Sequence, residues 1–104
     1  MTDNKKIQEI QFLEQNLQNI VFQKQAFQME LSETQASLNE LENSNEEVFK
    51  IIGQMMVKTE KSKIKDELKE KEKLIQLRVS TLEKQEEKFA EKLENLRKEI
   101  IPNK

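Results

Sequence analysis

Apolar residues recur along the first part of the chain at alternating intervals of three and four positions. Eight of the ten members of this series are apolar. The series is Ile10, Leu13, Leu17, Ile20, Lys24, Phe27, Leu31, Thr34, Leu38 and Leu41. A period of 3.5 residues is typical of the seam of a left-handed coiled coil. The polar residues 43–45 interrupt the series, so the pattern predicts one long helix over about residues 5–42.

A second series of the same period occupies the last part of the chain, and seven of its eight members are apolar. It runs through Ile75, Val79, Leu82, Glu86, Phe89, Leu93, Leu96 and Ile100. Upstream it continues less regularly through Leu68 and Ile64, which indicates a local shift in the repeat. Ser62 is a candidate N-cap, and Pro102 marks the far end. The second predicted helix therefore covers about residues 63–101.

Two helices of similar length joined by about 20 residues predict an antiparallel hairpin within one chain. Residues 1–42 hold 3 basic and 7 acidic side chains, whereas residues 64–104 hold 11 and 10. This difference reduces like-charge repulsion between the two helices. The heptads alone do not fix orientation, so a parallel dimer of two chains stays open.

Polar side chains occupy three positions of these seams, namely Lys24, Thr34 and Glu86. The favoured explanation is that a narrow two-helix seam leaves them partly exposed to water. The alternative is that they fix the register of the two helices. Neither interpretation makes them a functional site.

The stretch between the helices contains two five-residue runs, VFKII and MMVKT, on either side of Gly53 and Gln54. Their β-branched and aromatic residues favour strands, and a two-residue loop that begins with glycine favours a type II′ turn. A β-hairpin is therefore predicted over about residues 48–59. Phe49 and Ile51 point to one face, and Val48 and Ile52 point to the other.

An isolated two-stranded hairpin is only marginally stable in water, and its open edges can pair with other strands. We therefore expect the hairpins of several subunits to pair edge to edge in an intersubunit barrel. The residues expected at this joint are Val48, Phe49, Ile51, Ile52, Gly53, Met55, Met56 and Val57.

The composition narrows the class of protein. Of the 104 residues, 35% are apolar and 37% are charged, so we expect a single, mostly helical domain without a compact globular core. The formal charge of −2 argues against a nucleic-acid partner, because phosphate binding needs a positive field. The chain has no His and no Cys. We therefore expect no enzymatic activity, no cofactor and no metal site.

The sequence predicts neither a membrane-spanning segment nor a secretion signal. Its apolar runs are too short to cross a bilayer, and the N-terminal residues lack the apolar core of a secretion signal. We expect a cytoplasmic protein with no membrane partner.

Apolar residues near the two chain ends fall outside the seams. Ile7, Phe12 and Ile101 cannot all be buried by two helices, so we expect an exposed apolar cluster there. This tip cluster comprises Ile7, Ile10, Phe12, Leu13, Leu96, Ile100 and Ile101. The alternative is that these residues simply close the last helical turns.

The stretch VFKIIGQMMVKTEKSKIKDELKEK resembles the central signature of β-class subunits of the prefoldin family. The matching positions are Val48, Phe49, Lys50, Gly53, Val57, Lys58 and Thr59. A single hairpin fits the β class, since α-class subunits carry two. The absence of proline from ENSNEE departs from many members. The short ends of the chain resemble archaeal members.

The resemblance implies a hexamer of two α-class and four β-class subunits joined through a double β-barrel. Coiled-coil arms would bind unfolded client proteins at their tips and pass them to a group II chaperonin without ATP. The tip cluster would then bind clients. A structural coiled-coil adaptor for one folded partner is the main alternative. A coiled coil that binds nucleic acid through its Lys-rich second helix is a weaker one.

Overall fold

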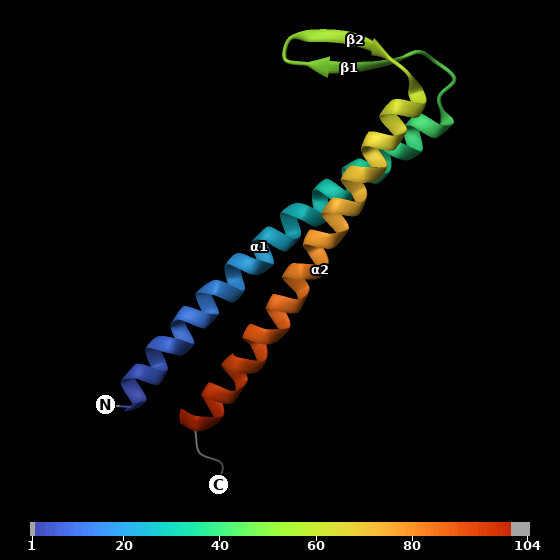
Figure 1. Ribbon diagram of the computed structural model, residues 1–104. Coiled ribbons are helices and arrows are strands. Elements are labelled where there is room, and N and C mark those ends of the chain that lie inside the picture. The colour runs from blue at the N-terminus through green and yellow to red at the C-terminus, as the bar shows by residue number, and fades with distance from the viewer. Residues whose placement is uncertain (1, 101–104) are drawn as a thin grey trace. The chain divides into compact units, whose positions relative to one another are not determined.

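The computed structural model describes residues 2–100, and in this part of the chain two long helices flank one β-hairpin (Figure 1). The elements are α1 (Thr2–Asn43), β1 (Val48–Ile52), β2 (Met55–Thr59) and α2 (Lys61–Ile100). The predicted fold class is therefore confirmed. The pairing of hairpins from several subunits in a barrel stays a prediction. Both helices begin slightly earlier than the sequence pattern indicates.

The sequence pattern suggested Ser62 as the N-cap of the second helix, and this prediction is wrong. The helix begins at Lys61, directly after β2, so Ser62 lies inside it. The backbone carbonyl of Glu60 accepts a hydrogen bond from the amide of Ile64 at 3.2 Å. Glu60 is therefore the N-cap residue, whose carbonyl accepts the first hydrogen bond of the helix. It is the single residue between the end of β2 at Thr59 and the start of α2.

The chain divides into two compact units, each containing part of α1 and part of α2. Unit 1 comprises residues 1–27 and 78–104, and unit 2 comprises residues 28–77. The single domain over residues 1–104 stays a prediction.

Unit 1 holds the two helices together by an apolar seam. Its buried apolar residues are Leu13, Ile20, Leu82 and Leu93, all members of the two 3.5-residue series. Ion pairs flank the seam. They join Lys6 to Glu99 at 3.9 Å, Glu14 to Arg97 at 2.7 Å and Lys24 to Glu86 at 2.7 Å. Early residues of α1 pair with late residues of α2, so the two segments are antiparallel.

The pair between Lys24 and Glu86 lies on the seam itself. The two side chains are 19% and 30% exposed, and Lys24 Nζ donates a hydrogen bond to Glu86 Oε1 at 2.7 Å. This hydrogen bond raises the pKa of Lys24 above its ordinary value of 10.5. Two of the three polar interruptions of the seams therefore satisfy each other directly.

We expect Lys24→Met to lower the melting temperature more than Lys98→Met, because it leaves the Glu86 carboxylate half-buried without its cation. Lys98 is the matched control, since its pair with Glu94 is exposed. The double variant Lys24→Leu with Glu86→Leu is expected to melt above the wild type. Thermal circular dichroism measures all three. Equal melting of the two single variants would contradict this role.

The pH dependence of this contribution follows from the direction of the shift. The pKa of Lys24 is raised in the folded chain, so the pair stabilises fully below the unfolded value of 10.5. The contribution is lost as the pH rises through the folded pKa. The melting-temperature differences above should therefore be constant around neutral pH and shrink only in strongly alkaline buffer.

Unit 2 contains a polar residue that the sequence analysis misjudged. Thr34 was expected to be partly exposed, but it is only 3% exposed. Its hydroxyl donates to the backbone carbonyl of Glu30 at 2.8 Å, within its own helix. This local bond satisfies the hydroxyl and lets Thr34 pack like an apolar residue on the seam. Leu41 and Ile75 are the buried apolar residues of this unit.

Ion pairs also join the two helices of unit 2. Lys71 lies 3.4 Å from Glu30, and Lys65 lies 3.0 Å from Glu42. The hydrogen bond from Lys65 holds the pKa of Glu42 below its ordinary value of 4.5. The stabilisation is therefore present at neutral pH and is lost as the pH falls below 4.5 through the folded pKa.

The C-terminal end of α1 receives its positive charge from α2. The last turn of α1 contains no basic residue. Lys61 Nζ, at the start of α2, donates instead to the backbone carbonyl of Ser44 at 2.7 Å. A cation beside the negative end of a helix dipole is stabilising. Lys61 therefore secures the end of α1 next to the hairpin.

The β-hairpin has antiparallel register with Ile52 opposite Met55 and Val48 opposite Thr59. Gly53 has a φ of 60°, and no other residue in the described range has a positive φ. A type I′ turn needs a positive φ at both central residues, so it is excluded. The turn therefore matches the predicted type II′.

We expect Gly53→Ala to cost the hairpin about 1–2 kcal/mol, the penalty for a left-handed backbone in an L-residue with a Cβ. A clash is not the cause, because a Cβ at this position meets nothing within 4 Å. Gln54→Ala is the matched control, since Gln54 needs no positive φ. Amide hydrogen exchange across residues 48–59 measures the effect. Equal exchange in both variants would refute the strained turn.

Candidate functional site

The hairpin exposes apolar side chains on both faces. Ile51 and Met56, which pair across the strands, are 72% and 70% exposed. Ile52 and Met55 pair on the opposite face and are 52% and 63% exposed. A two-stranded sheet also leaves one edge of each strand unpaired. This element can therefore bury apolar surface and add strands at the same time.

The lysines of the hairpin lie outside the two residue pairs next to the turn. Lys50 is 3.0 Å from Glu67 of α2, and Lys58 is 3.1 Å from Glu47. Such exposed pairs contribute little stability, about 0–1 kcal/mol each. Their position leaves the four residues next to the turn without charge.

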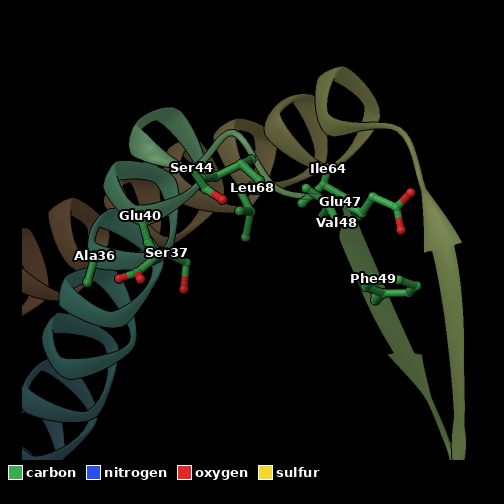
Figure 2. Close-up of a pocket in the computed structure, with 10 residues that line it drawn as sticks. Ala36, Ser37, Glu40, Ser44, Glu47, Val48, Phe49, Ile64 and Leu68 are labelled. Carbon is green, nitrogen blue, oxygen red and sulfur yellow. The ribbon is translucent and has the colours of Figure 1, made fainter.

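A groove of about 470 Å³ lies in unit 2 beside β1 (Figure 2). Its lining comes from the end of α1, from the connection between α1 and β1, from β1 and from the start of α2. The lining residues are Ala36, Ser37, Glu40, Leu41, Ser44, Glu47, Val48, Phe49, Ile64 and Leu68. Val48 and Phe49 of β1 line the groove together with Ile64 and Leu68 of α2 (Figure 2). The apolar surface of the hairpin thus continues onto both helices.

The residues expected at the joint between subunits all lie in this hairpin. Phe49 is 47% exposed and Val57 is 39% exposed, while Val48 is half-buried at the groove. Gly53 forms the turn. The contribution of the groove was missed by the sequence analysis, because Leu41, Ile64 and Leu68 were assigned only to the seams.

The tip cluster lies in unit 1, and its described members differ in exposure. Phe12 is 66% exposed and Ile7 is 43% exposed, whereas Leu13 is buried in the seam at 5%. Three members, Ile10, Leu96 and Ile100, are half-buried. Ile101 lies outside the described residues. Leu13 is therefore a core residue, and contact with clients by the exposed members stays a prediction.

A second hollow, which the sequence analysis did not identify, lies in unit 1 and has a volume of about 450 Å³. Its lining residues are Phe12, Asn16, Asn19, Ile20, Gln23, Gln85 and Phe89. None of them is charged. The sequence signal was the amide-rich stretch QNLQNIVFQKQ, of which only Leu17, Ile20 and Lys24 were assigned to the seam.

Residues 2–100 were also compared with the requirements of a metal site and of a membrane-spanning helix. No group of three or more acidic side chains in this range is arranged to hold a metal ion. No helix in the same range is both long and apolar enough to span a bilayer.

Comparisons with known proteins give the family of this chain. The family model described as prefoldin subunit matches residues 4–102. The chain belongs to the prefoldin subunit family. The match includes the hairpin and nearly all of both helices, so the resemblance noted around Val48–Thr59 is confirmed.

Curated prefoldin relatives specify the class. "Prefoldin subunit beta" of Thermococcus onnurineus is 42% identical over 89 residues, which cover 84% of this chain and 77% of the relative. The protein of that name from Thermococcus kodakarensis is 40% identical over 94 residues, covering 88% and 80%. The one from Pyrobaculum calidifontis is 34% identical and covers 81% and 69%. The predicted β-class resemblance is therefore confirmed.

A solved prefoldin structure agrees with the fold. The crystal structure of the prefoldin beta subunit from Thermococcus strain KS-1 matches with a TM-score of 0.90 and 38% identity. The match covers 95% of this chain and 89% of that one. Both the class and the two-helix fold with one hairpin thus have independent support.

Proposed function

We propose that this prefoldin subunit is part of an ATP-independent chaperone that holds unfolded polypeptides. In this proposal four copies join two α-class subunits through their hairpins, and the tip clusters bind clients in the cytoplasm. The clients are then delivered to a group II chaperonin. The family membership supports the hetero-oligomeric complex, and the surfaces of this chain support the two roles assigned to it.

The exposed apolar hairpin is the observation that carries the proposal. A single chain leaves Ile51, Ile52, Met55 and Met56 more than half exposed on two faces of one small sheet. Contiguous exposed apolar surface marks interaction sites in soluble proteins. A hairpin with this surface and two open edges is stabilised when further strands add to it.

The exposed tip residues support the second role. Phe12 and Ile7 lie at the end of unit 1 that contains the first and last helical turns, where Lys6 pairs with Glu99. Their apolar surface is not covered by the partner helix. Contact with apolar segments of unfolded chains would bury this surface without requiring a particular client sequence.

The test measures aggregation of several unrelated denatured proteins, diluted without ATP into the reconstituted complex. We expect light scattering to be suppressed for all of them at near-stoichiometric amounts, because apolar contacts are not specific for one sequence. Suppression should also persist in high salt, unlike binding to nucleic acid. Saturable binding of a single folded partner, with no suppression, would instead identify an adaptor.

A further inference from the structure

One segment of α1 in unit 1 is almost free of charge. Residues 15–27 contain a single charged side chain, Lys24, in a chain that is 37% charged overall. Lys24 is already paired with Glu86 on the seam. Six residues of this segment are Gln or Asn with exposed or half-buried side chains. They are Gln15, Asn16, Gln18, Asn19, Gln23 and Gln25.

The uncharged hollow of unit 1 is built on this segment. Asn16, Asn19 and Gln23 come from α1, and Gln85 comes from α2. None of these four amides forms a hydrogen bond with another described residue, so their donors and acceptors are available. Phe12 and Phe89 add an aromatic ring from each helix, and buried Ile20 also belongs to the lining.

This lining is selective for one kind of ligand chemistry. A side-chain amide offers an N–H donor and a carbonyl acceptor, the same two groups that each peptide unit needs. The absence of charged side chains gives the hollow no counter-ion for a phosphate or an ionic cofactor. It also avoids the cost of desolvating charges when an uncharged chain enters. A volume of about 450 Å³ lies within the usual range of ligand sites.

We propose that the hollow binds an extended, uncharged segment of a non-native polypeptide through its backbone. The four amides hydrogen-bond successive peptide groups, and the two phenylalanine rings contact the side chains between them. The inference rests on the proposed holdase function and adds a second contact, along the arm, to the apolar contacts of the tip cluster. The four amides would recognise the peptide backbone, which every client shares.

Two matched variants test the hollow. Asn19→Asp with Gln23→Glu replaces two lining amides by nearly isosteric carboxylates. Gln18→Glu with Gln25→Glu adds the same charge to exposed positions of the same helix outside the lining. Both variants are assembled with the partner subunits, and helical content and complex mass are checked before binding is measured.

The probe is a fluorescent, uncharged peptide of serine, alanine and valine, followed by fluorescence anisotropy. We expect the lining variant to bind it about tenfold more weakly, which corresponds to the loss of one to two net hydrogen bonds. The control variant should stay within about twofold of wild type, because its charges are exposed and screened. A version of the peptide with N-methylated alternate residues should lose a similar factor on the wild-type complex.

Equal binding of the probe by both variants would overturn the inference. So would unchanged binding of the N-methylated peptide, because backbone recognition requires its N–H groups. A changed complex mass in the lining variant alone would show that another subunit occupies the hollow, and this too contradicts the proposal. If the wild-type complex suppresses aggregation but any of these contradicting outcomes is observed, only the proposed role of the hollow is refuted. Failure of suppression itself refutes the holdase function.

Discussion

Replacing Phe49 or Ile51 by Asp is expected to abolish the assembled complex while leaving the helices of the single chain intact. Ile51 is 72% exposed and Phe49 is 47% exposed in the single chain, so a carboxylate there costs little on its own. The same carboxylate in a joint between hairpins is desolvated without a partner, at a cost of roughly several kcal/mol. Each interface repeats that cost, so even partial assembly should fail.

The matched control for the hairpin is Gln54→Asp, which places the same charge in the exposed turn beside Gly53. Far-ultraviolet circular dichroism should show equal helix content in all three variants. Native mass spectrometry should show the full complex for wild type and Gln54→Asp, but only smaller species for the other two. Survival of the full complex with both Phe49→Asp and Ile51→Asp would rule out the hairpin as the joint.

The second large effect concerns the tip cluster. We expect Phe12→Ser to weaken suppression of client aggregation by more than tenfold, and the addition of Ile7→Ser to abolish it. A phenylalanine buries about 150–250 Å² in an interface. Because 66% of Phe12 is exposed, a client can bury about two thirds of that area. At about 25 cal/mol per Å² this is worth roughly 2.5–4 kcal/mol. Neither change should alter folding, because both side chains are exposed.

Phe22→Ser is the matched control for Phe12→Ser, since Phe22 lies on the same helix of the same unit and is 58% exposed. It belongs neither to the tip cluster nor to the uncharged hollow. Light scattering of a denatured client, with the concentration of complex varied, gives the effect of each variant. If Phe12→Ser and Phe22→Ser act alike, the tips are not the place where clients bind.

The helical seams were predictable because their signal is local. Leu13, Ile20, Leu82 and Leu93 stand in an unbroken 3.5-residue repeat, and all four are buried. The hairpin was predictable for a similar reason. Gly53 lies between two β-branched runs, and its positive φ confirms the turn that this pattern favours.

Features that depend on pairing between distant residues were not predictable in the same way. Lys24 and Glu86 were identified separately as interruptions of two seams, but only the register of the two segments brings them within 2.7 Å. Burial of Thr34 depends on the bond from its hydroxyl to Glu30, which is one of several options open to a threonine. Ser62 is a good cap by residue type, yet the close approach of β2 and α2 moves the helix start to Lys61.

The candidate sites also divide into one with a local sequence signal and one that depends on residues distant in the sequence. The exposure of Ile51 on β1 and Met56 on β2 could be expected from the sequence, because apolar residues occupy both faces of the predicted hairpin and nothing else in the chain was available to cover both. The hollow between Phe12 and Phe89 could not, since it needs side chains from both helices at one level. Its amide-rich segment was visible in the sequence, but amides also serve as ordinary surface residues.

Native mass spectrometry of this chain, recovered with its partners from its own cells, tests the central claim most directly. The account predicts a six-subunit particle that contains four copies of this chain and two copies of a longer one. A monomer or homodimer bound to one unrelated protein would contradict it, while leaving the antiparallel helices and the hairpin unaffected.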